Sequence, residues 1–370
     1  MSAANLSVLH VCTDFWPSTG GIERFVLDLA RHSAAAGVQA SVLCFDRSAS
    51  SQARMPAHDI VAGIPVHRIG FVDLKFYKPA LLPLAMLRRH DIVHVHGVGA
   101  QLDYAVATKW LHGRPIVLST HGGLFHTPAL LPLKRLYFFG LQRVVAKFVD
   151  AIVACSGTDQ ALFSRISRRV GLIENGVDVA SYLAMSRDAQ ERGRCLHVGR
   201  LSDNKGVAEL LRAFAVASEK GVSFQLRLVG RDVDGNQARY ERLARDLGIG
   251  ARVVFCGEIG QDALLDEYRR AQVFVSASRY EGFGLSALEA KAAGLTLVLN
   301  RNAAFDSLFS RDSDAVLVDF SQARIAGQVL VATLAGEPVV PSTRHRADVY
   351  SWRHKVVEWD SLYRSCLARH

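Results

Sequence analysis

Two glutamates eight positions apart, Glu281 and Glu289, have the spacing in this sequence that most directly suggests chemistry. They lie in residues 279–289, a segment that follows a short β-branched run and contains two glycines beside which a ligand could approach the backbone. A helix that begins near Gly284 would offer free amides in its first turn, and such amides bind phosphate. Glu289 falls about one and a half turns into that helix, where its carboxylate can accept hydrogen bonds from vicinal hydroxyls. The pattern favours a phosphate and sugar site over a solvated helix with two surface glutamates.

A second candidate is the loop of residues 199–206, which reads Gly-Arg-Leu-Ser-Asp-Asn-Lys-Gly. It lies between a strand-like run at 195–198 and a helical pattern, so Arg200 and Lys205 are both placed to reach a diphosphate. Two exposed cations on a loop are the alternative, and the strand–loop–helix setting favours the functional interpretation.

A third candidate is the glycine pair Gly20 and Gly21, which closes residues 17–21 and leads from the first strand-like run into a helix. Glycine-rich turns of this kind cradle phosphate, although the pattern is neither GxGxxG nor a P-loop. A plain tight turn is the alternative.

A fourth candidate is His121, which precedes two glycines and directly follows the strand-like run at 116–118. A histidine at the carboxyl end of a strand can donate to a sugar hydroxyl or take a proton. A structural loop histidine is the alternative.

Two further patterns have residue types that bind metals. His94 and His96 share one face of a strand, and Asp232-Val233-Asp234 has the Asp-x-Asp spacing of metal–diphosphate motifs. Neither has neighbouring ligands that would complete a metal site, so we expect a turn at 232–234 and no bound metal. The six cysteines form no C-x-x-C pair and are expected to be buried free thiols.

The elements that must position these residues are short apolar runs alternating with longer helical patterns, as in a doubly wound α/β domain. The alternation restarts after Asn175-Gly176, which predicts residues 1–175 as one Rossmann-like domain and residues 176–349 as a second. Two such domains facing each other would make a central cleft, and their ligands would bind outside the carboxyl ends of the strands. An aromatic tail from residue 347 reads as a closing helix.

The composition describes a globular chain with an uneven charge. No apolar run reaches the roughly 18 residues of a membrane span, and the N-terminus lacks the features of a signal peptide, so we expect a cytoplasmic protein. The formal net charge is +9, and residues 1–175 hold 18 basic against 11 acidic residues. A basic half suggests nucleic acid, an anionic membrane surface or an anionic substrate. No stripe of interleaved aromatic and basic residues supports nucleic-acid binding.

Together these motifs resemble the retaining, two-Rossmann-domain (GT-B) enzymes of glycosyltransferase family 4, over nearly the whole chain. The resemblance implies that Glu281 contacts the donor sugar, Glu289 the ribose, and Arg200 with Lys205 the diphosphate, without a metal. It also implies that His121 lies near the transferred sugar and that residues 350–370 pack back on the first domain. The expected donor contacts are Gly20, Gly21, Arg200, Lys205, Glu281, Gly282, Phe283, Gly284, Leu285, Ser286 and Glu289.

Within the family, the runs at 93–97, 119–127 and 174–178 resemble exopolysaccharide mannosyltransferases of the xanthan and acetan type. That resemblance implies GDP-mannose as donor and a polyprenyl-diphosphate-linked glycan as acceptor. A UDP-sugar enzyme of lipopolysaccharide or other glycan assembly is the alternative. One departure from the family lies at residues 300–305, where Asn-Arg-Asn-Ala-Ala-Phe replaces the usual Gly-Gly-x-x-Glu. A phosphorylase or sugar-nucleotide epimerase on the same architecture is a rival in another enzyme class.

A lipid-linked acceptor must be met at the bilayer, so a peripheral membrane surface is expected in the first domain, on the cytoplasmic face of the inner membrane. Arg135, Phe139, Arg143 and Lys147 recur every four residues of a predicted helix, and Lys134 adds a neighbouring cation. A second group of basic and aromatic residues lies at 75–78. Basic residues beside aromatics suit an anionic headgroup layer. An ordinary solvated helix with its apolar side in the core is the alternative.

Overall fold

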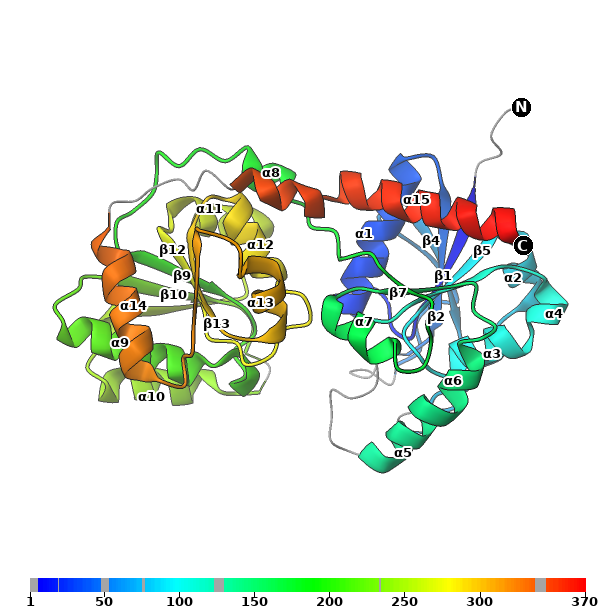
Figure 1. Cartoon of the computed structure of the whole chain (residues 1–370), viewed down its shortest axis with the longest axis horizontal. Coiled ribbons are helices and arrows are strands. Elements are labelled where there is room, and N and C mark those ends of the chain that lie inside the picture. Colours follow the sequence, from blue (N-terminus) through cyan, green and yellow to red (C-terminus); the bar gives the residue numbers. More distant parts are fainter. Residues whose placement is uncertain are drawn as a thin grey trace. The chain divides into compact units, whose positions relative to one another are not determined.

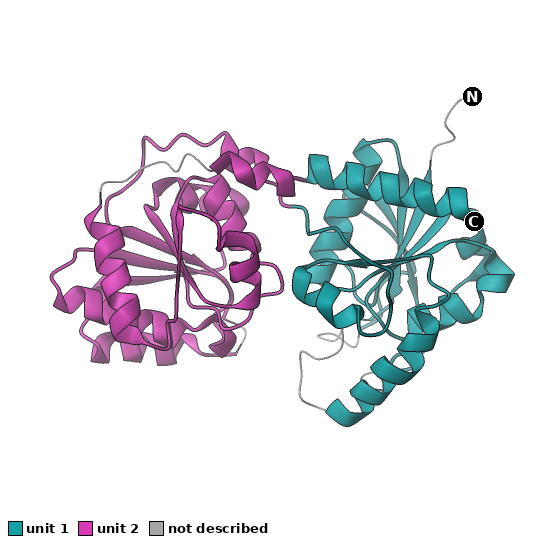
Figure 2. Ribbon diagram, in the orientation of Figure 1, with its two compact units in different colours: residues 1–176, 352–370 teal, residues 177–351 magenta. Residues whose placement is uncertain are grey.

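The structure, a computed structural model, describes residues 6–18, 20–47, 53–74, 77–122, 130–232, 234–336 and 344–370. The chain divides into two compact units, which Figure 2 colours separately. Unit 1 comprises residues 1–176 and 352–370, and unit 2 comprises residues 177–351. No helix in the described part of the chain is long and apolar enough to cross a membrane.

Unit 1 is built on an eight-stranded sheet with the order β3-β4-β2-β1-β5-β6-β7-β8 (Figure 1). All neighbouring strands run parallel except β3 and β4. The central strands are buried on both faces, as helices on both sides of a parallel sheet require. The strands are β1 (Ser7–Val11), β2 (Gln39–Phe45), β3 (His58–Val61), β4 (Ile64–Ile69), β5 (Ile92–His96), β6 (Ile116–Ser119), β7 (Ala151–Ala154) and β8 (Val170–Leu172).

The helices of unit 1 include the last one of the chain, α15, which packs beside α1. Trp352, Trp359 and Tyr363 of α15 are buried in the core cluster that α1 also enters with Phe25. A Cβ on Gly176 would collide with the Trp352 ring, so the residue before the unit boundary has to be glycine. The helices are α1 (Gly21–Ala35), α2 (Leu84–Arg89), α3 (Ala100–Ala107), α4 (Lys109–His112), α5 (Leu131–Leu136), the π-helical turn η1 (Tyr137–Leu141), α6 (Gln142–Val145), α7 (Gly157–Phe163) and α15 (Trp352–Arg369).

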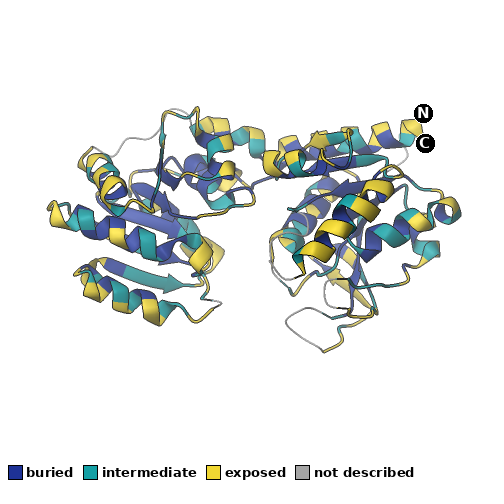
Figure 3. Cartoon of the chain, turned by 60° about the horizontal axis from the view of Figure 1, so that its bottom comes forward, coloured by how far each residue is buried: buried dark blue, intermediate teal, exposed yellow. Residues whose placement is uncertain are grey.

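Unit 2 is built on a six-stranded parallel sheet with the order β11-β10-β9-β12-β13-β14. Figure 3 shows its strands largely buried and the outer faces of its helices exposed. The strands are β9 (Arg194–Val198), β10 (Gln225–Val229), β11 (Val253–Gly257), β12 (Val273–Ser276), β13 (Thr296–Asn300) and β14 (Ala315–Val318). The helices are α8 (Ala180–Leu183), η2 (Asp203–Lys205), α9 (Val207–Glu219), α10 (Gln237–Asp246), η3 (Gly250–Arg252), α11 (Gln261–Arg270), α12 (Leu285–Ala292), α13 (Ala303–Phe309), α14 (Ala323–Ala335) and η4 (Arg344–Tyr350).

The tail differs from the predicted single helix that starts at residue 347. The 3₁₀ turn η4 ends at Tyr350 within unit 2, and α15 starts at Trp352 within unit 1. The break arises because the Tyr350 carbonyl accepts a hydrogen bond from the Val177 amide at 2.7 Å, which takes it out of a continuous helix.

Each sheet has one position at which the strand order reverses. In unit 1 it lies between β1 and β5, and in unit 2 between β9 and β12. Ligands of open α/β sheets bind outside the carboxyl ends of the strands at such a point. The loops that follow β1, β5, β9 and β12 are therefore where each unit should carry its site.

Candidate active site

The two loops that follow β9 and β12 meet through an ion pair. The Lys205 ammonium lies 2.6 Å from a carboxylate oxygen of Glu281, and each side chain is less than one-fifth exposed. The two strands are paired neighbours in the sheet, so their loops are brought to the same edge. The structure thus joins two candidates that lie 76 positions apart in the sequence.

Backbone contacts hold the same two loops together. The Arg279 amide donates to the Asn204 carbonyl at 2.9 Å, and the Asn204 side-chain amide donates to the Tyr280 carbonyl at 3.0 Å. The Arg279 guanidinium also pairs with Glu209 on α9. With donors and acceptors matched in this way, the position of Glu281 relative to Lys205 is fixed by the fold of unit 2 itself.

Gly206 is the glycine that lets the first loop turn into α9. Its φ is +65°, a left-handed conformation, and a Cβ there would collide with the backbone carbonyl of Ala277. Any other residue would be strained at this angle and would also push the loop after β9 away from β12. The glycine therefore sets the close approach on which the Lys205–Glu281 pair depends.

Glu289 lies on α12, the helix that follows Glu281. The Tyr268 hydroxyl lies 2.9 Å from a Glu289 carboxylate oxygen and 3.2 Å from the Ser286 carbonyl. The helix begins at Leu285, so the Leu285 and Ser286 amides have no carbonyl one turn earlier to bind. The first turn of α12 thus offers the Leu285 and Ser286 amides, and about one turn later the Glu289 carboxylate is held by the Tyr268 hydroxyl.

Two asparagines that the sequence analysis did not assign support this loop. Asn300 and Asn302 both donate to the Ser278 carbonyl, at 3.0 and 2.9 Å. Asn302 also caps α13 by accepting from the Phe305 amide at 2.9 Å. These residues replace the usual family segment after β13, and in this chain they position the start of the loop that carries Glu281.

The other predicted site residues of unit 2 differ in how exposed they are. Arg200 is exposed on the loop after β9. Gly282 is exposed with open space where a Cβ would be, whereas Phe283 and Gly284 are buried. Asp232 accepts from the Asn236 and Gln237 amides at 2.9 and 3.0 Å, so its carboxylate caps the start of α10, as the turn interpretation requires. Val233 lies outside the described residues.

His197, at the end of β9, was missed by the sequence analysis. Its Nδ1 donates to the Val275 carbonyl at 3.0 Å, because a carbonyl can only accept. Burial lowers the pKa of His197 to about 4, so Nε2 carries a lone pair at neutral pH. Within the described residues that nitrogen has no hydrogen-bond partner, and it faces Gly199 beneath the loop. No sequence motif marked this residue, because its role depends on which strand lies beside β9.

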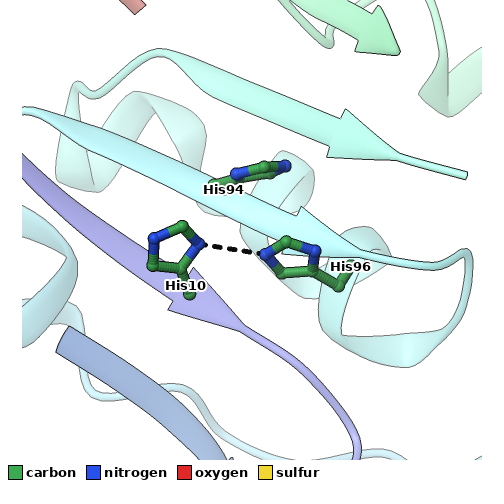
Figure 4. A group of neighbouring side chains, drawn as sticks. All are labelled: His10, His94 and His96. Carbon is green, nitrogen blue, oxygen red and sulfur yellow. Dashed lines mark hydrogen bonds between the residues drawn. The ribbon is translucent and has the colours of Figure 1, made fainter. Parts of the chain in front are cut away.

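At the corresponding point of unit 1, three histidines and a cysteine lie in a hydrogen-bonded row. His10 Nδ1 is 3.0 Å from His96 Nε2, His96 Nδ1 is 3.1 Å from His121 Nε2, and His121 Nδ1 is 3.5 Å from Cys155 Sγ. His94 lies beside the row, bonded to Ser119 and Tyr363. Figure 4 shows His10 on β1 and His94 and His96 on β5, with the hydrogen bond between His10 and His96 drawn as a dashed line.

Burial keeps these imidazoles uncharged. It lowers the pKa of His10 to about 3 and that of His121 to about 4, and it brings the pKa of His94 and His96 well below 6.5. A neutral imidazole has one N–H and one lone pair, so the tautomer of one ring fixes that of the next. His121, held at a left-handed φ of +46°, is therefore oriented by His96, which sequence reasoning did not connect to it.

Three of these histidines, His10, His94 and His96, could hold a metal ion, since their ligand atoms lie within 4.8 Å of one another. They are the only such group of three in the described part of the chain. Both nitrogens of His94 are already hydrogen-bonded, and structural zinc sites have four ligands. The hydrogen-bonded row accounts for these side chains without an ion.

Gly20 and Gly21 lie at the start of α1, where the backbone amides of Gly20 and Glu23 already donate to the Glu23 carboxylate. A Cβ on Gly20 would collide with the carboxylate of Glu23, so a carboxylate of the chain already faces this turn. Burial raises the pKa of Glu23 and of nearby Asp14, whose buried Oδ1 has no partner within the described residues. Thr19 of the same turn and Gly123 beside His121 lie outside the described residues.

The predicted basic helix is a rod of α5, η1 and α6, which projects from the sheet of unit 1 in Figure 1. Arg135, Arg143 and Lys147 are exposed, but Lys134 is buried and is withdrawn from the proposed surface. Lys134 lies on the buried face of the rod with Phe138, Gln142 and Val145, whereas Leu130, Leu133, Leu136, Leu141, Val144 and Phe148 are 45–71% exposed. Lys75 and Phe76 of the second basic group lie outside the described residues.

Sequence comparisons match both halves of the chain. The profile named Glycosyltransferase Family 4 matches residues 19–181, and the profile named Glycosyl transferases group 1 matches residues 186–334. A GDP-mannose:cellobiosyl-diphosphopolyprenol alpha-mannosyltransferase from Xanthomonas oryzae pv. oryzae is 34% identical over 98% of this chain and 97% of its own length. The protein of that name from Komagataeibacter xylinus is 30% identical over 98% of this chain and 94% of its own.

Solved structures show the same fold at lower identity. A glycosyltransferase from Rickettsia africae has a TM-score of 0.76 at 16% identity, and the alignment covers 98% of this chain and 99% of that one. The sucrose-phosphate synthase of Thermosynechococcus elongatus has a TM-score of 0.73 at 19% identity, with 99% and 100% covered.

Proposed function

The chain belongs to glycosyltransferase family 4, with the GT-B fold, and we propose that it transfers mannose from GDP-mannose to a polyprenyl-diphosphate-linked cellobiose, with retention of anomeric configuration. The observation that carries this proposal is the 34% identity, over almost the full length of both chains, to an enzyme named for that reaction. The product would be a lipid-linked trisaccharide for exopolysaccharide assembly. A UDP-sugar donor and a lipopolysaccharide acceptor remain the second reading to be tested.

Unit 2 binds the nucleotide sugar in this proposal. Lys205, Arg200 and the first amides of α12 stabilise the negative charge that develops on the diphosphate when its bond to the anomeric carbon breaks. Preorganised charge of this kind is usually the largest catalytic contribution. The Lys205–Glu281 contact of 2.6 Å supports this assignment, because it holds the cation in place before any donor arrives.

The two glutamates take different parts of the donor. Glu281, beside Lys205, accepts hydrogen bonds from hydroxyls of the transferred sugar, and Glu289 accepts them from the ribose. Tyr268 supports the second role because its hydroxyl, 2.9 Å away, holds the Glu289 carboxylate on one face of α12. Phe283 and Gly284 are buried beneath this loop and shape it, while exposed Gly282 leaves space for the ligand.

Unit 1 binds the acceptor, and His121 lies near the reacting sugar as a neutral imidazole whose Nδ1, in weak contact with the Cys155 thiol at 3.5 Å, is the nitrogen that a sugar hydroxyl would meet. The row of histidines behind it supports an orienting role, since His96 contacts the Nε2 atom directly. Gly20 and Gly21 contribute backbone at the same edge of the sheet.

Unit 1 also lies against an anionic membrane surface, on the cytoplasmic face of the inner membrane. Arg143 and Lys147 share a hollow with Arg168 and Arg169, which gathers four cations at one end of the α5–α6 rod. Exposed leucines, valine and phenylalanine along that rod would enter the headgroup layer, as in interfacial helices. The arrangement favours a protein that lies on the bilayer and meets its lipid-linked acceptor there.

The test is transfer of radiolabelled sugar to a synthetic polyprenyl-diphosphate cellobiose, with GDP-mannose, UDP-glucose and UDP-galactose offered in parallel. Mannose transfer from the GDP donor, with an α-linkage in the product, is the expected result. Activity should survive EDTA, because Lys205 and Arg200 replace a metal in the proposal. Transfer only from a UDP-sugar would support the second reading, and complete loss on chelation, restored by magnesium, would refute the metal-independent assignment.

A further inference from the structure

A hollow of about 760 Å³ in unit 1 has no role in the reaction as described so far. Its walls come from the chain after β2, the chain after β4 and the helix α3, and they include Arg47, Arg54, Phe71, Leu81 and Asp103. We propose that this hollow binds the isoprenyl diphosphate portion of the acceptor, an inference that rests on the proposed function. Its volume lies within the range of about 300–1,000 Å³ typical of small-ligand pockets.

The position of the hollow fits an acceptor site. β4, β2 and β5 run parallel, and the lining residues follow their carboxyl ends. Gly20 and His121 follow the carboxyl ends of β1 and β6 in the same sheet. A ligand bound in the hollow therefore lies at the edge of unit 1 that carries the other candidates, as expected for open α/β sheets.

The apolar part of the lining suits a hydrocarbon better than a sugar. Phe71 stacks on Phe45 with ring centroids 4.3 Å apart, which makes a rigid aromatic wall. Val72 and Leu81 at the rim are 60% and 81% exposed, an unusual pair of apolar side chains to leave beside an open pocket. Contiguous exposed apolar surface of this kind marks a binding site for an apolar ligand.

The charged part of the lining suits a diphosphate. Arg47 donates to the Phe71 carbonyl at 2.9 Å and its guanidinium lies over the Phe71 ring, so the cation is fixed at the aromatic wall. Arg54, with a side chain 78% exposed, shares the carboxylate of Asp46 with Arg47. Lys78 adds a third cation, 5.3 Å from the Phe71 ring centroid. The two arginines and Lys78 thus stand against two carboxylates, Asp46 and Asp103, which leaves an excess of positive charge for an anion.

Asp103, the acidic residue of the lining, links the hollow to the α5–α6 rod. Its carboxylate accepts from the hydroxyls of Tyr77 and Tyr137 at 3.1 and 2.7 Å and from the Gln142 amide at 2.6 Å. Tyr137 opens η1 and Gln142 opens α6, so one wall of the hollow is hydrogen-bonded to the segment with exposed leucines. A lipid that enters along the rod would reach the hollow without crossing the rest of unit 1.

Farnesyl diphosphate, below its micelle concentration, is the probe for calorimetric binding to the full chain. Arg54→Gln and Leu81→Ser, both at exposed positions, should each weaken binding about tenfold, as the loss of a charge-assisted hydrogen bond or of buried apolar area predicts. Arg31→Gln and Ile60→Ser alter exposed residues of unit 1 outside the hollow and are the matched controls. Inorganic diphosphate binding as tightly as farnesyl diphosphate, or equal losses in the controls, would overturn the proposal.

Transfer kinetics separate this inference from the proposed function. With the polyprenyl-linked acceptor, the KM for acceptor should rise about tenfold in Arg54→Gln and Leu81→Ser. The affinity of unit 2 for GDP should stay at the wild-type value, and the urea midpoint of tryptophan fluorescence, which reports unit 1, serves as the folding control. If the wild-type protein moves no mannose from GDP-mannose, the proposed function fails and the farnesyl diphosphate titration still decides the hollow. If it moves mannose and neither variant changes either measurement, the hollow alone is refuted.

Discussion

Unit 1 and unit 2 share a layout of parallel sheet and flanking helices but differ in what they expose. Unit 1 contains 22 lysine and arginine residues against 13 acidic ones, whereas unit 2 contains 22 of each, so the net charge of the chain resides in unit 1. Among the described residues, 14 large exposed apolar side chains belong to unit 1 and four to unit 2. A surface both basic and apolar suits an anionic, lipid-bearing partner, and a balanced polar surface suits a water-soluble one.

At the points where the strand order reverses, it is unit 2 that places charged side chains and unit 1 that places neutral ones. Unit 2 places a charged pair there, Lys205 with Glu281, whereas unit 1 places neutral histidines, with His10, His94 and His96 fully or almost fully buried. The candidate site of unit 2 thus contains an ion pair, whereas the excess of basic residues in unit 1 lies outside its row of histidines. Under the proposed function, unit 2 would hold a diphosphate donor and unit 1 a lipid-linked acceptor, and variants in each unit test the two roles separately.

The largest effect is expected at the charged pair of unit 2. Lys205→Ala and Glu281→Gln should each lower kcat by roughly 10²–10³, the usual cost of removing one preorganised electrostatic contact. Lys220→Ala, an exposed lysine after α9, is the matched control and should retain wild-type transfer. Steady-state transfer from GDP-mannose provides the measurement. Near-wild-type turnover in Glu281→Gln would remove this residue from the site.

The sequence predicted the fold class, the family and the enzyme class, and all three are confirmed. The buried central strands carry continuous apolar runs that single-sequence reasoning detects. Strands β3, β4, β8 and β14 were not predicted because they are partly exposed, so their residues lack such continuous buried runs. β3, β8 and β14 are edge strands and β4 lies next to the edge, where strand propensity depends on neighbours that the sequence does not identify.

The roles of individual site residues stay predictions. The contacts that the sequence did not predict are those between elements far apart in the chain. Asn300 and Asn302 support the Glu281 loop through one carbonyl, that of Ser278, and nothing local in the sequence marks that contact. Lys134 was placed on the surface because spacing along a helix does not tell which side packs against the sheet. The π-helical turn at 137–141 further changes the register between Arg135 and Arg143.

The second effect concerns the surface of unit 1. Replacing Arg135, Arg143 and Lys147 with Ser should weaken binding to anionic vesicles by about 3 kcal/mol, or roughly 10², at about 1 kcal/mol per cation. Leu136→Ser and Phe148→Ser should weaken binding to the same vesicles through lost apolar burial. Sedimentation with vesicles of neutral lipid alone or with one-third anionic lipid gives the measurement, and added salt should release the wild-type protein.

The matched control for that experiment removes three exposed arginines from unit 2, at Arg242, Arg311 and Arg324. This variant should sediment like the wild type. Equal weakening in both triple variants would mean that net charge alone drives binding, and equal binding to neutral and anionic vesicles would dismiss the proposed surface.

A third effect is expected from the buried histidines. Their pKa is lowered by burial, to about 3 for His10 and about 4 for His121, while in the unfolded chain a histidine titrates near 6.5. Between those values the unfolded state binds more protons, so stability falls as pH falls from about 6.5 towards 4. The slope should be at least that of one proton, about 1.4 kcal/mol per pH unit. All four tryptophans belong to unit 1, so urea unfolding followed by tryptophan fluorescence at pH 7 and pH 5 measures it.

Two variants make that measurement specific. His96→Gln breaks the buried row and should reduce the pH dependence of the fluorescence midpoint, whereas His354→Gln, at an exposed position of α15, should leave it unchanged. Circular dichroism reports both units and should lose less signal than fluorescence at pH 5. The reason is that His197 is the only described histidine of unit 2 whose pKa is lowered. Identical midpoints at the two pH values would contradict the assignment of these imidazoles as neutral.

The smallest effect is expected at Glu289. Its carboxylate is assigned to the ribose hydroxyls, and Glu289→Gln exchanges a charged acceptor for a neutral one of the same shape. A charge-assisted hydrogen bond contributes about 1.5–3 kcal/mol, of which the amide retains part, so the affinity for GDP should fall about tenfold while vesicle binding by unit 1 is unchanged. Tyr268→Phe removes only the hydroxyl that holds the carboxylate, 2.9 Å away, and should weaken GDP less than Glu289→Gln does. Glu219→Gln, an exposed glutamate at the end of α9, controls for the loss of one negative charge in unit 2. Calorimetric titration with GDP distinguishes the outcomes: unchanged affinity in Glu289→Gln would refute the ribose contact, and a larger loss in Tyr268→Phe than in Glu289→Gln would mean that the tyrosine, rather than the glutamate, supports the nucleotide.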